Sequence, residues 1–101
     1  MQYESGTKVT DGTACLYLNV TAGSAVAKVG MGQLYGATVN SHTSGTLKFL
    51  DAAATATAST VIFNTITLAA GERYVELGGV TFSTGLVYVV GGTANVTLHY
   101  R

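Results

Sequence analysis

Several residue types are scarce or missing in this chain of 101 residues, and each absence excludes a class of protein. Proline and tryptophan are absent, and Cys15 is the single cysteine, so no internal disulfide can form. Charged residues make up 10% of the chain, against roughly 25% in typical soluble domains. No apolar run approaches the ~20 residues that a membrane-spanning helix needs. We therefore expect neither a disulfide framework nor a membrane partner.

The few charges are balanced, with Lys+Arg 5 against Asp+Glu 5 and a formal net charge of +0. Because the chain has no basic cluster, we expect no nucleic-acid partner. The first six residues show no basic stretch followed by an apolar one, which predicts synthesis in the cytoplasm without a secretory signal. A protein of near-zero charge tends to associate, so we expect part of its surface to be covered in an assembly.

Residues typical of strands dominate what remains. Val, Thr, Ile, Tyr and Phe recur throughout, and the glycines, Gly 13 in number, interrupt them at short intervals. No segment keeps a helical period, and we interpret residues 51–59, rich in Ala and Thr, as an ordered loop with a helical turn. The pattern predicts one all-β domain over 1–101, a compact antiparallel β-sandwich or small β-barrel of jelly-roll or immunoglobulin size.

Short turn signals predict how the strands are connected. We expect hairpins between 34–40 and 46–51, between 60–68 and 73–77, and between 86–90 and 94–100. Gly71 is expected to supply a positive φ in the second of these turns. Strand 73–77 is expected to break at Gly78-Gly79 and to resume at 80–82 before a turn at 83–85. In the last strand Val96, Leu98 and Tyr100 alternate with Asn95, Thr97, His99 and Arg101, which predicts one buried and one wet face.

The N-terminal third has weaker signals. Asp11-Gly12 predicts a hairpin between 7–10 and 13–20. A further short strand is expected at 25–31, after a turn at 21–24. We interpret 1–31 as an N-terminal hairpin or arm and 32–101 as the core strands.

The residues that carry chemistry do not form a recognisable motif. No Gly-x-Ser-x-Gly elbow frames a serine, and no paired Cys or His spacing suits a metal. His42 is expected on a solvated loop tip, His99 on the polar face of the last strand, and Cys15 in a small buried site. We therefore predict no enzyme, no catalytic residue, no cofactor and no metal site.

The composition instead predicts a binding surface. The six tyrosines exceed the needs of a small core, and tyrosine suits interfaces because it combines a large apolar ring with a hydrogen-bonding hydroxyl. Arg73, Glu72 and Glu76 form either a local ion network or the polar rim of a contact. The candidate interface residues are Tyr3, Tyr17, Tyr35, His42, Arg73, Glu76, Tyr100 and Arg101.

Short segments over the last two-thirds of the chain carry a resemblance. They read GQLYGATVN at 32–40, GTLKFLD at 45–51, LAAGER at 68–73, FSTGL at 82–86 and VTLHYR at 96–101. With these segments the chain resembles small structural proteins of tailed bacteriophages, and capsid decoration (cement) proteins are the best match among them.

The resemblance implies a virion component on the capsid surface, made in the host cytoplasm. Its implied partners are the major capsid protein and further copies of itself, with a homotrimer favoured, and it carries over no catalytic residue. The alternative is a glycan- or receptor-binding module of a tail or head fibre. The absence of tryptophan counts against that alternative, because tryptophan stacks best on sugar rings.

Overall fold

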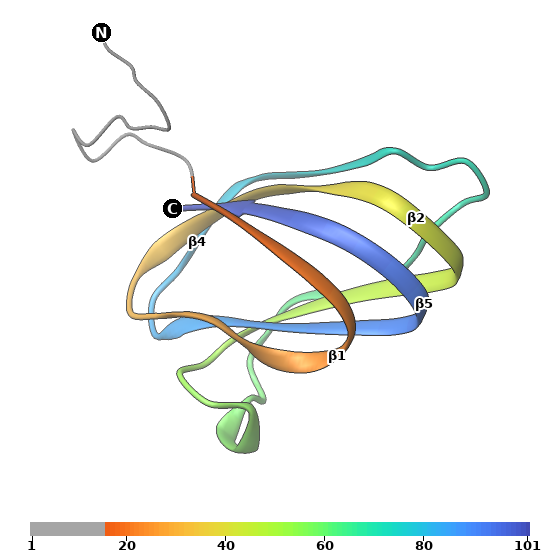
Figure 1. Ribbon diagram of the computed structural model, residues 1–101. Coiled ribbons are helices and arrows are strands. Elements are labelled where there is room, and N and C mark those ends of the chain that lie inside the picture. The colour runs from red at the N-terminus through yellow and green to blue at the C-terminus, as the bar shows by residue number, and fades with distance from the viewer. Residues whose placement is uncertain (1–15) are drawn as a thin grey trace, which may run out of the picture.

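The computed structural model describes residues 16–101, which form one antiparallel 5-stranded sheet (Figure 1). Its elements are β1 (Leu16–Val29), β2 (Gly32–Asp51), the 3-10 helix η1 (Thr55–Thr57), β3 (Val61–Thr67), β4 (Tyr74–Phe82) and β5 (Gly85–Tyr100). This confirms the all-β class and the helical turn expected within 51–59. The hairpin expected across Asp11-Gly12 lies outside the described residues. Residues 25–29 of the strand expected at 25–31 belong to β1, and the turn expected at 21–24 is wrong, because β1 continues through it.

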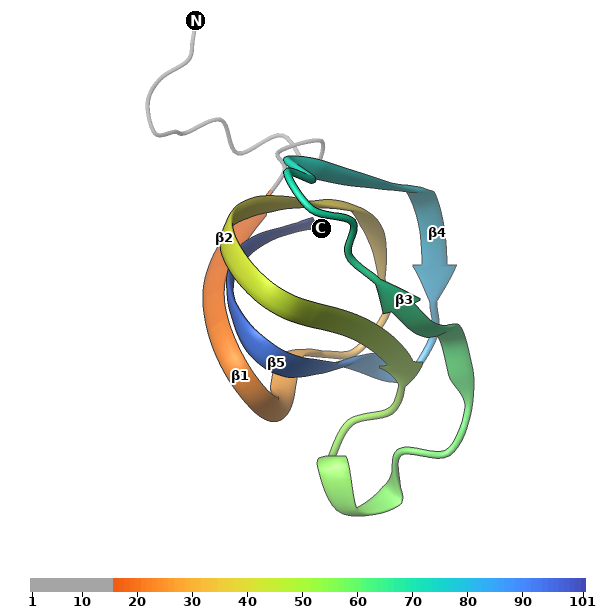
Figure 2. The ribbon, with the colours of Figure 1, turned by 90° about the vertical axis from the view of Figure 1, so that its right-hand side faces the viewer.

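The three longest strands, β1, β2 and β5, curve so that the single sheet forms two facing layers (Figure 2). The first half of β2 pairs with the second half of β5, and the second half of β2 pairs with the first half of β5. β1 follows β5 along its length, while β4 pairs with the first half of β2 and β3 with the second half. We call the layer with β4 the first layer and the layer with β3 the second layer.

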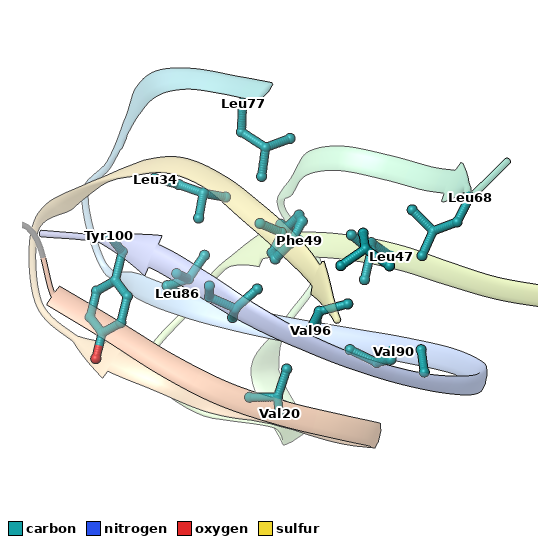
Figure 3. Packing of buried hydrophobic residues seen from close by; sticks show 14 of the residues in the cluster. Val20, Leu34, Leu47, Phe49, Leu68, Leu77, Leu86, Val90, Val96 and Tyr100 are labelled. Carbon is teal, nitrogen blue, oxygen red and sulfur yellow. The ribbon is translucent and has the colours of Figure 1, made fainter. Parts of the chain in front are cut away.

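The core lies between these layers (Figure 3). Leu34 and Val96 point inward from the first layer, and Leu47 and Phe49 point inward from the second. Leu98 belongs to the same buried cluster. All five side chains are 0% exposed. Burial of each such side chain stabilises the fold by about 1.5–3 kcal/mol.

The alternation expected in the last strand is confirmed. Val96, Leu98 and Tyr100 are buried in the core, whereas Asn95, Thr97 and His99 are half-buried on the opposite face. Because side chains alternate along a strand, this register fixes which residues the first layer presents outward.

Two of the expected hairpins, at 34–51 and at 86–100, are wrong. Residues 41–45 lie within β2 and residues 91–93 within β5, so each pair of expected strands is one continuous strand. Both strands bend at the same place, where Gly92 has φ 71 and a Cβ on it would meet the Ser44 carbonyl oxygen. The small residues at 41–45 and 91–93 therefore allow β2 and β5 to bend from one layer into the other, and the chain does not reverse its direction there.

The connection between β3 and β4 also differs from the expected hairpin. The two strands pair with different halves of β2 and not with each other. Gly71 does take the expected positive φ of 79. Gly78 and Gly79, with φ 74 and φ 71, form a bulge inside β4 instead of ending it.

A second, smaller apolar cluster lies on the outer side of the second layer. Val87 is 0% exposed there, because it packs with Leu50 and Ala52, and Ala58 from the following loop packs against them. The small side chains of residues 52–58 allow this loop to lie close to the sheet. Within residues 16–101 the outward faces of the two layers therefore differ, since a loop packs on the second layer and no element covers the first.

Asp51 fixes the corner between β4 and β5. Its carboxylate accepts hydrogen bonds from the Ser83 N–H at 2.9 Å, the Ser83 hydroxyl at 3.1 Å, the Thr84 N–H at 2.8 Å and the Gly85 N–H at 3.2 Å. The Ser83 N–H lowers the pKa of Asp51 most, and the smaller opposing effect of burial leaves the pKa below its ordinary value of 3.8.

Candidate binding face

Within residues 16–101, the outward side of the first layer carries mainly uncharged polar and aromatic side chains, with the charged Glu76 and Arg101 at its margin. We call it the polar face, and its members are Tyr17, Asn19, Thr38, Asn40, Tyr74, Asn95, Thr97 and His99. They come from four neighbouring strands, since the register places Tyr17 opposite His99, and Thr38 opposite both Thr97 and Tyr74. None of them carries a formal charge at neutral pH when histidine is neutral.

Side-chain amides tie the strands of this face together. The Asn19 Nδ2 donates to the Asn95 Oδ1 at 2.8 Å, and the Asn40 Nδ2 donates to the same oxygen at 3.0 Å. Both amides also donate to the Thr97 Oγ1, at 3.3 and 3.1 Å. The Asn95 Oδ1 accepts a hydrogen bond from each neighbouring amide, and its Nδ2 has no acceptor within residues 16–101, so it can donate to a ligand. The network holds these groups in fixed orientations, so little conformational entropy is lost on binding.

The aromatic rings of His99, Tyr74 and Tyr17 lie beside the amide network. His99 Nε2 and Thr38 Oγ1 share a hydrogen bond of 2.8 Å, and the ring centroids of His99 and Tyr74 are 6.2 Å apart. Tyr74 lies over Gly36, where a Cβ would meet its hydroxyl oxygen. Tyr17 is 76% exposed on β1. Large amphipathic rings beside fixed amides are typical of protein-binding surfaces.

A cleft of about 660 Å³ adjoins the polar face and shares Asn40 with it. It lies between the middle of β2 and the β3–β4 connection, and His42 and Arg73 line it. The Gly45 N–H donates to His42 Nδ1 at 3.2 Å, so Nε2 carries the proton and donates to the Ala69 carbonyl at 2.8 Å. His42 is thus a half-buried link between elements, and the expected solvated loop tip is wrong.

The charged cluster at 72–76 does not form an ion network. Glu72 Oε1 accepts from the Ala69 N–H at 3.0 Å, and Glu76 Oε2 accepts from the Gly78 N–H at 3.1 Å. Within residues 16–101 neither carboxylate pairs with Arg73, which is exposed at the cleft. Each glutamate therefore fixes its own turn or bulge.

The remaining candidate residues take no part in the amide network. Tyr35 donates its hydroxyl to the Gln33 Oε1 at 3.0 Å, and Arg101 pairs with Gln33 through its backbone. Tyr100 is 9% exposed and lies at one end of the core cluster (Figure 3), which leaves little of it for a partner. Tyr3 lies outside the described residues.

Sequence reasoning singled out Tyr17 but missed the amides beside it. Asn19, Asn40 and Asn95 are separated by many residues, and each looks like an ordinary strand or turn residue in isolation. The available signal was the polar half of the alternation at 95–99. These polar residues are recognised as part of a site only when the pairing of β5 with both β1 and β2 is known.

Residues 16–101 contain no group of three or more His, Cys, Asp or Glu placed to hold a metal ion. No helix within that range is long and apolar enough to cross a membrane.

No protein-family model matches the chain, and neither a curated protein nor a solved structure matches it. The polar face and the cleft are therefore interpreted from their own chemistry.

Proposed function

We propose that this chain is a structural binding protein that attaches through its polar face to a larger protein assembly, and that the assembly is the head of a tailed bacteriophage. The single observation that supports this proposal is the fixed network of uncharged hydrogen-bonding side chains on the first layer. The phage setting rests on the resemblance of the segments at 32–40, 45–51, 68–73, 82–86 and 96–101.

The chemistry of the face suits a neutral protein surface. Amides and hydroxyls cost less to remove from water than charges do, and each regains a hydrogen bond to a backbone or side-chain group of the partner. Tyr17 adds apolar contact area at the margin of the amide network. A face of this kind binds without requiring a complementary charge, which agrees with the net charge of +0.

Such binding stabilises the assembly by mass action. A protein that binds the assembled capsid lattice but not its free subunits shifts the equilibrium toward the lattice, by about 2.7 kcal/mol per site at a free concentration of 100 Kd. In this role the major capsid protein is the partner, and no catalytic step is involved.

The experiment that tests this proposal measures the amount of the protein in purified virions of the phage that encodes it. We expect a fixed, simple ratio to the major capsid protein, and heads lacking the protein should be less resistant to heat. Its absence from virions would refute the proposal, and a low copy number would assign it to a fibre or connector instead.

A glycan-binding module of a fibre is the second candidate. The outward Asn95 amide beside the Thr97 hydroxyl, with the exposed Tyr17 ring nearby, presents groups that also bind sugar hydroxyls. A glycan array with the purified chain tests it, with binding at millimolar or tighter affinity as the positive result. Binding to purified heads with no glycan signal would exclude this candidate.

A further inference from the structure

The outer edge of β1 is a candidate interaction site distinct from the polar face. Among residues 16–101, β1 pairs with β5 and no strand lies on its other side. Figure 2 shows β1 at one side of the molecule and β3 and β4 at the other. An open strand edge presents a row of backbone N–H and C=O groups to any strand that can approach it.

The backbone pairing shows which residues present these groups. Gln33 and Arg101 exchange both of their backbone hydrogen bonds, so the backbone of Arg101 faces β2. Since backbone direction alternates along a strand, Tyr100, Leu98 and Val96 face β1. Their register partners on β1 are Leu16, Leu18 and Val20. The alternate residues Tyr17, Asn19 and Thr21 therefore point their N–H and C=O groups away from β5, toward the open edge.

This edge lacks the usual protection against pairing. Strands at sheet edges are normally guarded by charges, proline, bulges or short length. β1 is 14 residues long, contains no proline, and has Lys28 as its single charge. Its register is regular from Leu16 to Thr21, and the shifts come later, at Thr21/Gly23 and Val26/Lys28.

The edges at the other side of the sheet are protected. β4 contains Glu76 and the bulge at Gly78-Gly79, and β3 is 7 residues long. The regular segment Tyr17–Thr21 of β1 is thus the best template for strand addition in the described part of the chain. A neutral edge does not repel an identical one, which makes a second copy of the chain the occupant that fits.

We propose that two copies pair antiparallel through residues 17–21, on a two-fold axis at Asn19. Tyr17 then faces the partner's Thr21, Asn19 faces the partner's Asn19, and each facing pair exchanges two backbone hydrogen bonds. On the inner side, Leu18 lies opposite the partner's Val20, which extends the core across the axis. The first layers of the two copies become one sheet with a continuous polar face, so a bound pair gains avidity.

Sedimentation equilibrium of the full chain tests this pairing. The expected mass rises with concentration from 10.3 kDa toward twice that value. Thr21→Pro removes an outward N–H without breaking a bond to β5, so it should weaken dimerisation at least tenfold, on the order of one lost hydrogen bond per copy. The matched control Thr21→Val keeps the N–H and should dimerise like the parent chain. A monomer at all concentrations, or the trimer implied by the resemblance, would overturn the proposal.

Cross-linking tests the register itself, in a Cys15→Ser background. Facing residues of a hydrogen-bonded antiparallel pair have Cα atoms about 5.5 Å apart, which suits a disulfide. Asn19→Cys should therefore form a covalent dimer under mild oxidation. Thr21→Cys is the control, because the two copies of residue 21 are separated by roughly 13 Å along the strands. Equal yields from both variants, or no dimer from Asn19→Cys, would refute the two-fold axis at Asn19.

Discussion

Replacing Asp51 by alanine should destabilise the corner between β4 and β5 more than any other single change at an exposed or half-buried charge. The carboxylate accepts hydrogen bonds from three consecutive backbone N–H groups, at 83, 84 and 85, and from the Ser83 hydroxyl. A hydrogen bond to a charged group contributes about 1.5–3 kcal/mol where water is excluded. Because Asp51 is half-buried and water can replace part of these bonds, we expect a total loss of about 2–3 kcal/mol.

The effect of Asp51→Ala on the Tm is measured by calorimetry. A loss of 1 kcal/mol lowers the Tm of a domain of this size by about 4–8 °C, so Asp51→Ala should melt roughly 8–24 °C below the parent chain at neutral pH. Glu72→Ala is the matched control, since Glu72 accepts a single hydrogen bond, from the Ala69 N–H. A fall in Tm no larger than that of the control would refute the corner as a stabilising element.

The pH dependence follows from the lowered pKa of Asp51. The pKa in the folded chain lies below the ordinary value of 3.8, so the contribution to stability is fully present above that value. It is lost as the pH falls through the folded pKa, where the carboxyl takes up a proton. The difference in unfolding free energy between the parent chain and Asp51→Ala should therefore shrink on acidification. A difference that stays constant from neutral pH to below pH ~2.5 would contradict the assignment.

Three further changes test the bend, the amide network and the cleft. Gly92→Ala should cost at least about 2 kcal/mol in a urea titration, because φ 71 and the nearby Ser44 carbonyl both oppose a Cβ. Asn95→Ala should cost about 1–2 kcal/mol in the same titration, because two neighbouring amides lose their shared acceptor. His42→Ala should speed amide hydrogen exchange in the β3–β4 connection, because its bond to Ala69 is lost.

The sequence allowed the strands to be predicted better than their connections. Alternation at 94–100 predicted the buried and wet faces of that segment, because the period of two is a local property. The signals at 41–45 and 91–93 were misinterpreted as reversals, since glycine and serine serve tight turns and corners equally well. Only the long-range pairing of β2 with β5 shows that both strands continue through the bend.

The same limit applies to the candidate site. Tyr17 was found from its residue type, whereas the amide network depends on residues from three strands meeting on one face. Asn95 has its role because β5 lies between β1 and β2, and no local pattern contains that information. The burial of Tyr100 was implied by its place beside Val96 and Leu98 in the alternation, although its type suggested an interface.

Binding of two isosteric charge variants to phage heads that lack the protein tests the central claim most directly. Asn40→Asp places one negative charge on the polar face, and Asn64→Asp places the same charge on β3, where an aspartate oxygen can still accept from the Thr65 N–H. Both asparagines are exposed, so both variants should fold. We predict saturable cosedimentation with heads for the parent chain and Asn64→Asp, and binding at least tenfold weaker for Asn40→Asp, on the order of one unpaired charge at the interface. Equal binding by both variants would contradict the assignment of the polar face as the attachment surface.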